Sequence, residues 1–386
     1  MVNTILVGGK VCTPDKILDP GVLVIDNKSI KTVEDQSKFR VPKTATVLDT
    51  SGCWILPGFI DIHIHGLLGY DCMGSDLDQV IRKLPEYGVT SFMATTMTRP
   101  KEEINSLIPQ MASVLSDPPL GARCLGIHVE GPHFSPKRPG MANPEWFSLL
   151  TASEIDRLQT IANGLVRMLT FAPEEGTAMD VIPHLIANNI TPVIGHSNAS
   201  YELTEEAISL GVSQATHTFN AMSPMHHRDP GVVGAVLANT SIIAQLIGDG
   251  YHVHPGAMQV LLNAKGISKV CLISDAAPFA GLPSGKYNWG DQNVYIDGKT
   301  SRLDDGTLAG SHALIDTGFR NLIELLGLNI SEAIQCASIV PAQSVGVGNT
   351  KGQLLPGYNA DIVVLDKNYR ILLTIVEGEI VWRANQ

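Results

Sequence analysis

The sequence predicts an α/β fold, a (β/α)8 TIM-type barrel that carries a small β-sandwich-like domain built from both chain ends. Three observations support this prediction: eight short apolar runs, helical patterns between most of them, and strand-like segments at both termini. Strands that are apolar throughout are typical of a parallel sheet buried on both faces. Eight strands that alternate with helices favour a closed barrel over an open, doubly wound sheet.

The eight expected barrel strands lie between residues 55 and 344. They are Phe59–His65, Val89–Thr95, Arg123–Glu130, Val166–Phe171, Ile190–His196, Ser213–His217, Ile242–Gly248 and Lys269–Asp275. Amphipathic patterns predict helices over Asp76–Tyr87, Lys101–Leu115, Ser153–Ala162, Thr177–Asn188, Pro255–Lys265, Ala313–Leu326 and a short stretch near Ser331–Ser338. Residues 284–304 interrupt this alternation with polar and glycine residues, and we interpret them as a hairpin insertion.

Both ends of the chain are rich in strand-like runs. Those before the barrel are Thr4–Val7, Val22–Ile25 and Ile30–Val33, and those after it are Asp361–Leu365, Ile371–Ile375 and Glu379–Trp382. Gly, Asp and Asn separate the first three, as expected of turns. The sequence therefore predicts a small β-domain from residues 1–54 and 345–386, packed beside a catalytic barrel of residues 55–344.

The composition is that of a globular protein with an acidic surface. The chain has 386 residues, of which 44% are hydrophobic, and its formal net charge is -11. An acidic chain is a poor general binder of nucleic acid or anionic membrane, so neither partner is expected. The six cysteines form no C-x-x-C pair, and no signal peptide or membrane-spanning run is expected. These features predict a cytoplasmic protein with reduced thiols.

Residues that can bind a metal stand at the ends of five of the eight expected strands. His63 and His65 are two residues apart on one strand, so both side chains point to the same face. The others end four different strands and are Glu130, His196, His217 and Asp275. In a barrel, the C-terminal ends of the strands ring one mouth, where active sites are built.

A carboxylate and several imidazoles that converge match the ligands of a divalent metal ion. The sequence therefore predicts one or two ions per chain, such as Zn, Fe, Mn or Co. The alternative is a set of unrelated polar strand ends, since an H-x-H pair alone is often structural. Buried charges that lack a partner or a metal are costly, which argues against this alternative.

Two segments beyond strand ends combine histidine with charged residues. Residues 226–230 (HHRDP) follow the His217 strand, and residues 249–252 (DGYH) follow the next one. Histidine and arginine together suit a phosphate clamp, whereas the alternative is a solvated loop. The run from Gly346 does not complete a dinucleotide-binding signature, and no Walker A or nucleophile-elbow sequence occurs.

These motifs resemble those of a known family. Residues 57–66 (PGFIDIHIHG) are similar to the opening signature of the amidohydrolase superfamily. Residues 128–132 (HVEGP), 195–197 (GHS), 216–222 (THTFNAM) and 308–311 (LAGS) resemble the N-acetylglucosamine-6-phosphate deacetylases. The resemblance extends from the first strands to about Leu365, and its NAM and EGP motifs are far more specific than H-x-H.

The resemblance implies a role for each matching residue. Glu130, His196 and His217 would hold the catalytic metal, and His63 and His65 a second one that Glu130 bridges. Asp275 would act as general base and then general acid. The residues implied to contact the substrate are Asn220, Ala221, Arg228, His252, Met141, Ala142, Leu308, Ala309 and Gly310. Arg228 would reach across the interface of a homodimer.

One position departs from the family pattern. Many members have G-A-H-N-P after the Glu130 strand, whereas this chain has Gly-Met-Ala-Asn-Pro at residues 140–144. Ala142 therefore stands where an imidazole would help to polarise the acetyl carbonyl. This replacement leaves open how the substrate is activated and which amino sugar is preferred.

The implied activity is hydrolysis of N-acetyl-D-glucosamine 6-phosphate to D-glucosamine 6-phosphate and acetate, in amino-sugar catabolism. A metal polarises the carbonyl and activates water, while Asp275 transfers the proton to the departing nitrogen. The alternatives are an N-acetylgalactosamine-6-phosphate deacetylase, and another amidohydrolase such as a cyclic-amide hydrolase or a deaminase. A further alternative is a catalytically inactive barrel that acts as a scaffold.

Overall fold

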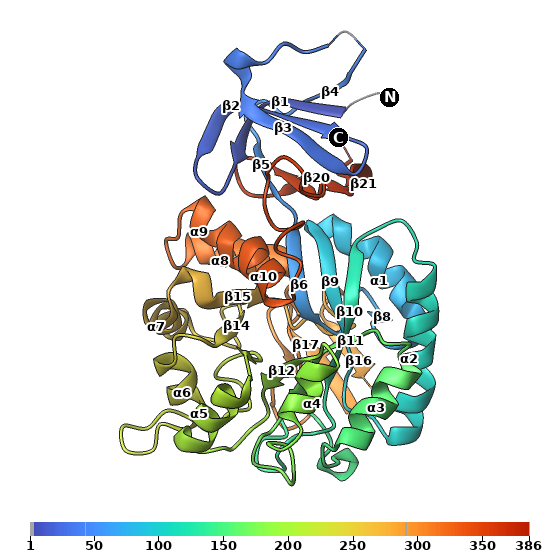
Figure 1. Ribbon diagram of the computed structural model, residues 1–386, viewed down its shortest axis with the longest axis vertical. Coiled ribbons are helices and arrows are strands. Elements are labelled where there is room, and N and C mark those ends of the chain that lie inside the picture. Colours follow the sequence, from blue (N-terminus) through green and yellow to red (C-terminus); the bar gives the residue numbers. More distant parts are fainter. Residues whose placement is uncertain (1–3, 43, 290–291, 386) are drawn as a thin grey trace.

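The computed structural model describes residues 4–42, 44–289 and 292–385, and it confirms the predicted barrel with an added sheet from the chain ends (Figure 1). Eight strands pair in parallel in the order β15-β14-β13-β12-β11-β10-β9-β6. In chain order they are β6 (Phe59–Ile64), β9 (Val89–Thr95), β10 (Arg123–Glu130), β11 (Val166–Phe171), β12 (Thr191–Ile194), β13 (Gln214–Ala215), β14 (Ile243–Ile247) and β15 (Val270–Ile273).

The first and last barrel strands meet at residues predicted to belong to the site. The backbone N–H of Asp275 donates to the carbonyl oxygen of His63 at 2.9 Å, and that of His65 donates to Ala276 at 2.8 Å. The interior below this seam is filled by apolar side chains such as Ile62 and Ile273. The barrel interior below the seam is therefore packed with side chains.

Helices form the outer layer of the barrel (Figure 1). They are α1 (Leu77–Lys83), α2 (Lys101–Ser116), α3 (Ala152–Ile161), α4 (Ile182–Ala187), α5 (Tyr201–Leu210), α6 (Gly231–Ala238), α7 (Pro255–Lys265), α8 (Ile315–Glu324), α9 (Ile330–Ile334) and α10 (Val340–Ser344). Shorter turns of helix occur at Gln36–Lys38, Gly74–Asp76, Leu84–Tyr87, Pro144–Trp146, Ile267–Lys269 and, in π-helical form, Gln335–Ile339. Within the described residues, no helix has the length and apolarity needed to span a membrane.

Several elements differ in length from the sequence-based expectation. The helix expected over Thr177–Asn188 is wrong in its first part, because residues 177–181 form turns and α4 begins only at Ile182. Three strands end earlier than expected, so that His196, His217 and Asp275 each lie two residues beyond the last strand residue. These side chains therefore project from turns at the mouth.

The strands from the two chain ends share one sheet above the barrel. Its order is β21 (Glu379–Arg383), β20 (Ile371–Val376), β19 (Ile362–Leu365), β5 (Trp54–Pro57), β1 (Thr4–Cys12), β2 (Ile17–Asp26) and β3 (Ser29–Asp35), with β4 (Thr46–Asp49) beside β1. Side chains from both ends, including Leu23, Ile25 and Ile362, form one core. The expected domain boundary between residues 54 and 55 falls inside β5, whose neighbours both belong to this sheet.

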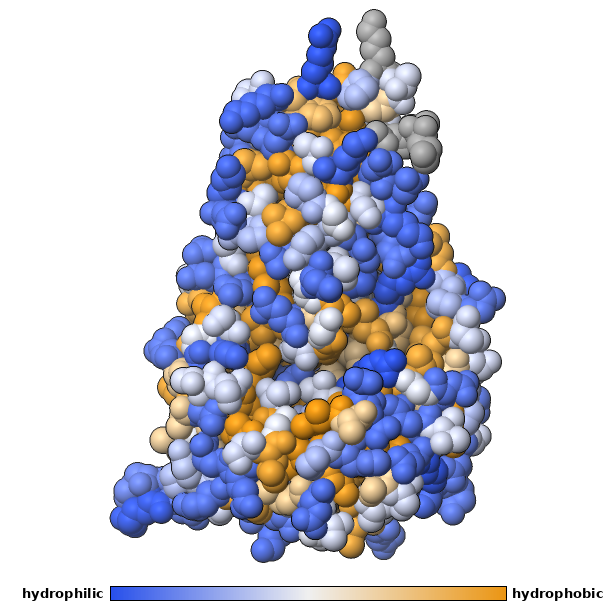
Figure 2. Space-filling view, viewed as in Figure 1, coloured by the Kyte–Doolittle hydropathy of each residue, from blue (hydrophilic) through white to orange (hydrophobic). Residues whose placement is uncertain are grey.

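Two small hairpins lie near the mouth of the barrel. The shorter one consists of β7 (Gly66–Leu67) and β8 (Tyr70–Asp71). The other is the predicted insertion, and it forms an antiparallel sheet of β16 (Gly285–Trp289), β17 (Gln292–Ile296) and β18 (Ser301–Arg302). On the face that Figure 2 shows, hydrophilic side chains alternate with small apolar patches.

A buried ion pair holds the last part of the chain against the start of the barrel. Lys351 Nζ lies 2.6 Å from Asp361 Oδ2, and both side chains are less than one tenth exposed. The other carboxylate oxygen of Asp361 accepts the backbone N–H of Glu377 at 2.8 Å. The backbone carbonyl oxygen of Asp361 accepts the backbone N–H of Gly58 at 3.0 Å. Asp361 therefore ties the sheet to the strand that carries the H-x-H motif.

Replacing Lys351 with Met should lower the free energy of unfolding by about 3–5 kcal/mol, because Asp361 is then an unpaired buried charge. Lys28→Met is the control, since Lys28 pairs with Glu377 from a side chain that is 72% exposed. Such exposed pairs contribute about 0–1 kcal/mol. Urea unfolding followed by circular dichroism measures both, and equal losses in the two variants would contradict this account.

Candidate functional site

A cavity of about 240 Å³ opens at the mouth of the barrel. The predicted site residues that line it are His65, Glu130, Met141, Ala142, His196, His217, Asn220, Ala221, His252, Asp275, Leu308 and Gly310. They come from six barrel strands and from the loops that follow them. The structure thus brings most of the predicted residues together in one pocket.

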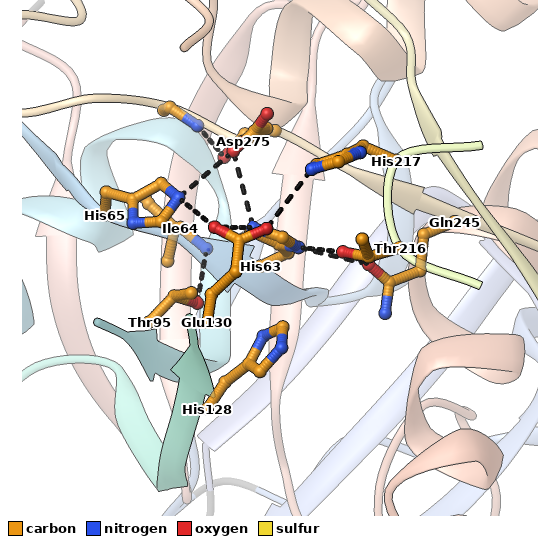
Figure 3. A network of polar contacts seen from close by, with 12 residues as sticks. His63, Ile64, His65, Thr95, His128, Glu130, Thr216, His217, Gln245 and Asp275 are labelled. Atoms are coloured by element: carbon orange, nitrogen blue, oxygen red, sulfur yellow. Dashed lines mark hydrogen bonds and ion pairs between the residues drawn. The ribbon is translucent and has the colours of Figure 1, made fainter. Parts of the chain in front are cut away.

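The two oxygens of Glu130 face different pairs of histidines. Figure 3 shows three of these histidines, His63, His65 and His217, around the carboxylate. Oε2 lies 3.3 Å from His63 Nε2 and 3.2 Å from His65 Nε2. Oε1 lies 3.1 Å from His217 Nε2 and 3.6 Å from His196 Nε2. One carboxylate therefore stands between two sets of nitrogen ligands.

Asp275 completes the first of these two sets. Its Oδ1 lies 3.4 Å from His63 Nε2 and 3.2 Å from His65 Nε2. The ligand atoms of His63, His65 and Asp275 all lie within 4.8 Å of one another, and so do those of Glu130, His196 and His217. Each group therefore has the residue types and the spacing that could hold a divalent ion.

The hydrogen bonds behind the histidines fix which nitrogen faces the pocket. His63 Nδ1 lies 3.1 Å from Gln245 Oε1, which can only accept, so this nitrogen carries the proton. His196 Nδ1 likewise donates to the carbonyl oxygen of Arg138 at 3.0 Å. In neutral imidazoles, Nε2 then presents a lone pair toward Glu130. Such outer hydrogen bonds orient metal ligands in many proteins.

Lone pairs that face a carboxylate require a cation between them. The buried Nε2 of His63 has no hydrogen-bond partner, although Glu130 Oε2 and Asp275 Oδ1 lie within 3.4 Å. His196 Nε2 and His217 Nε2 also face each other at 3.1 Å. A divalent ion resolves both contacts, since it accepts electron pairs from imidazole nitrogens and carboxylate oxygens alike. The residues present therefore fit such an ion.

The charges of the pocket support the same conclusion. Burial opposes ionisation of Asp275, but the imidazoles of His63, His65 and His217 outweigh it and lower the pKa of Asp275 to about 2. Burial also lowers the pKa of His65, but its contacts with Asp275 and Glu130 raise that pKa to about 10. In the absence of a metal, protons thus balance the two carboxylates. Metal binding to such ligands displaces protons.

Strained backbone aims several of these side chains. Positive φ angles occur at His196 (48°), His217 (22°), Ala221 (50°) and Asp275 (51°), all of which line the pocket. Residues other than glycine rarely adopt such angles, and the strain is typical of functional sites. The chain thus turns abruptly after each strand and directs the side chain inward.

One side of the pocket offers neutral donors and an anchored histidine. His252 Nδ1 lies 2.6 Å from Asp249 Oδ2, and Asp249 Oδ1 also accepts the backbone N–H groups of Tyr251 and His252. This bond holds Nδ1 and leaves Nε2 of His252 for a ligand. Asn220 and Ala221 line the same pocket and follow the neighbouring strand β13.

Three predicted residues do not line the cavity. His63 and Ala309 are fully buried behind it. Arg228 lies in the loop that leads into α6. This loop projects away from the barrel at the lower left of Figure 1. Its guanidinium is exposed and its Nη1 lies 2.8 Å from Nε2 of His227.

The sequence-based prediction missed several residues of the pocket. Met97 and Thr98 follow β9, so the rule that sites lie at the C-terminal ends of barrel strands could have identified them. Phe134 follows β10 and stacks on His196, with ring centroids 3.9 Å apart. Trp289 and Thr307 come from the insertion and the segment after it, where the sequence carries no comparable signal.

Known proteins similar to this chain extend along nearly its whole length. The N-acetylglucosamine-6-phosphate deacetylase of Bacillus subtilis (strain 168) is 36% identical, over 97% of this chain and 96% of that protein. The N-acetylgalactosamine-6-phosphate deacetylase of Escherichia coli O157:H7 is 34% identical, over 96% of this chain and 97% of that protein.

Solved structures and a family model agree with these relatives. The structure of an Asp-to-Ala variant of the Mycobacterium smegmatis N-acetyl-D-glucosamine-6-phosphate deacetylase, in complex with N-acetyl-D-glucosamine-6-phosphate, superposes with a TM-score of 0.90. It is 28% identical and covers 99% of this chain and 100% of its own. The model of the amidohydrolase family matches residues 54–381. This chain therefore belongs to the amidohydrolase family and, within it, to the N-acetylglucosamine-6-phosphate deacetylases.

Proposed function

We propose that this chain hydrolyses N-acetyl-D-glucosamine 6-phosphate to D-glucosamine 6-phosphate and acetate, a step of amino-sugar catabolism. The observation that carries the proposal is the convergence of four imidazoles on the two oxygens of Glu130, with Asp275 beside them. The similarity to deacetylases over the whole chain supports it, as does the related structure that holds this sugar phosphate.

Two cation positions follow from the pairing of ligands around Glu130. Glu130, His196 and His217 would hold the catalytic ion, and His63 and His65, with Glu130 or Asp275 beside them, would hold a second. Zn, Fe, Mn and Co all accept this donor set of imidazole and carboxylate. A bound ion polarises the amide carbonyl and lowers the pKa of water.

Asp275 moves the proton. Its low pKa keeps the carboxylate ionised near neutral pH, so it can accept the proton of the attacking water. The protonated carboxyl then donates to the nitrogen as the C–N bond breaks, which releases acetate and the free amine. The backbone bond from Asp275 to His63 holds the carboxylate beside the imidazoles.

The phosphate binds on the side of Asn220, Ala221 and His252. In this proposal the protein acts as a homodimer, and Arg228 supplies the cationic group from a second copy of the chain. Its exposed place on the loop before α6, outside the lining of its own pocket, supports this. The sugar is surrounded by the pocket-lining residues Met141, Ala142, Leu308 and Gly310. Ala309 is buried behind them and supports this part of the pocket. The six unpaired cysteines fit a cytoplasmic location.

Asp275→Asn should keep the fold and the bound metal while turnover falls by at least about 10²–10⁴-fold, because an amide cannot shuttle the proton. Acetate release from N-acetyl-D-glucosamine 6-phosphate measures the effect. Asp316→Asn is the control, since Asp316 pairs with Arg320 on α8 and does not line the pocket. Near wild-type turnover in Asp275→Asn would overturn the mechanism.

The His63→Ala/His65→Ala double variant should lose one metal equivalent and most of its activity, while His196→Ala should lose the essential metal. The reason is that Ala142 stands where an imidazole would polarise the carbonyl of the substrate. A second ion about 3.5–4 Å from the first can polarise this carbonyl instead. His128→Asn is the control, because His128 is buried beside His63 but bonds to Thr170.

Elemental analysis per chain, together with turnover, decides between one and two ions. The two-ion account predicts close to two equivalents in the active wild type and in His128→Asn. A fully active wild type with a single tight ion, and an undiminished rate in the double variant, would rule the second ion out.

Arg228→Ala and His252→Ala should weaken binding of the phosphorylated sugar and leave the unphosphorylated one nearly unaffected. A mixed dimer of Arg228→Ala and Asp275→Asn chains should recover one working site, because the first chain's site receives Arg228 from the second. Steady-state kinetics on purified mixed dimers measures this recovery. A mixed dimer as weak as its parents would show that Arg228 does not act across an interface.

A further inference from the structure

The pocket has two opposite sides of different chemistry. Around the barrel the strands run β6, β9, β10, β11, β12, β13, β14 and β15, so β9 lies four strands away from β13. The groups suited to phosphate, Asn220 and His252, follow β13 and β14. Met97 and Thr98 follow β9 and therefore lie across the mouth from them.

Trp289 lies beside the segment that follows β6, the strand that pairs with β9. Its ring lies against His65 of the adjoining strand segment, with centroids 5.6 Å apart and the planes at 66°. A second edge contact, to Phe279, also has centroids 5.6 Å apart. The indole N–H donates to Asp71 Oδ2 at 3.3 Å, so the ring is held in place on three sides. It is only 5% exposed.

The side chains of Trp289 and Met97 present no free hydrogen-bond donor to the cavity. The indole N–H of Trp289 is already bonded to Asp71. The hydroxyl oxygen of Thr98 is buried against Gly131 and has no hydrogen-bond partner among the described residues. Met97 adds a thioether that is 6% exposed. The surface that Met97 and the Trp289 ring present is therefore apolar, and the indole is fixed by its contacts.

The shape of the substrate directs its acyl group toward this surface, if the proposed function holds. In the pyranose ring, the carbon that bears the acetamido group lies across from the carbon that bears the phosphorylated CH₂ arm. A sugar whose phosphate lies at β13 and β14 therefore extends its amide over Glu130 and Asp275 toward β9. The methyl group of the acyl chain is the part that lies furthest from the phosphate.

We propose that Met97 and Trp289 form the wall that receives the acyl methyl group and that they limit the substrate to a short, apolar acyl chain. They are specificity-determining residues, because a longer acyl chain must displace a held indole or a buried thioether. A hydroxylated chain of the same length fares no better against these two side chains, since neither offers a free donor to its hydroxyl. This inference rests on the proposed function and concerns the same pocket.

The test uses the metal-loaded enzyme and four amides of D-glucosamine 6-phosphate: N-acetyl, N-propionyl, N-butyryl and N-glycolyl. All four release the same amine, whose formation gives kcat/KM for each. In the wild type, kcat/KM should fall by about 10–200-fold from acetyl to propionyl, the discrimination that one methylene allows in an apolar pocket. N-Glycolyl, which is close in shape to propionyl, should be no better than propionyl.

Met97→Ala should raise the propionyl-to-acetyl ratio of kcat/KM by about tenfold or more, because it removes a thioether arm larger than the one methylene that the longer chain adds. Trp289→Leu should extend the gain to butyryl. Leu308→Ala is the matched control: it also lines the pocket, and it should change kcat/KM for all four amides by a common factor. Metal content checks that each variant keeps its site.

Unchanged ratios in both Met97→Ala and Trp289→Leu, or a wild type that hydrolyses butyryl as well as acetyl, would overturn the inference while the deacetylase function stands. The same change of ratio in Leu308→Ala would also overturn it. A metal-loaded wild type inactive on all four amides would instead refute the proposed function, and the acyl wall with it.

Discussion

The arrangement around Glu130 is the constraint on which the rest of the site depends. A carboxylate in this pocket is only 7% exposed, and each of its oxygens faces two imidazole nitrogens at 3.1–3.6 Å. Lone pairs cannot remain so close to a buried anion without positive charge between them. Protons on the imidazoles or divalent ions must supply that charge, so the pocket couples protonation to metal binding.

The barrel is built to keep this arrangement rigid. The strand that carries His63 and the strand that leads to Asp275 meet at the seam where the sheet closes, through a backbone bond between these two residues. Gln245 and Arg138 hold the outer nitrogens of two imidazoles, and apolar packing fills the interior beneath. Four strained residues then turn side chains inward, and the surrounding fold must stabilise that strain.

The sequence predicted those parts of the molecule whose signal is local. The two-residue spacing of His63 and His65 placed both side chains on one face of their strand. Helix α7 has the bounds that its amphipathic pattern indicated. Helix α6 is apolar nearly all round because it is buried, so it has no amphipathic pattern to reveal it. Trp289 reaches the pocket from a distant insertion, and positive φ at His217 depends on tertiary packing, so neither could be predicted from local sequence.

Acetate release by the metal-loaded wild type tests the central claim most directly. The sugars to compare are N-acetyl-D-glucosamine 6-phosphate, its galactosamine counterpart and the unphosphorylated N-acetyl-D-glucosamine. The account predicts the highest kcat/KM for the phosphorylated glucosamine sugar, a lower value for its counterpart and a marked loss without the phosphate. Equal rates with and without the phosphate, or no acetate from any of the three sugars, would contradict it.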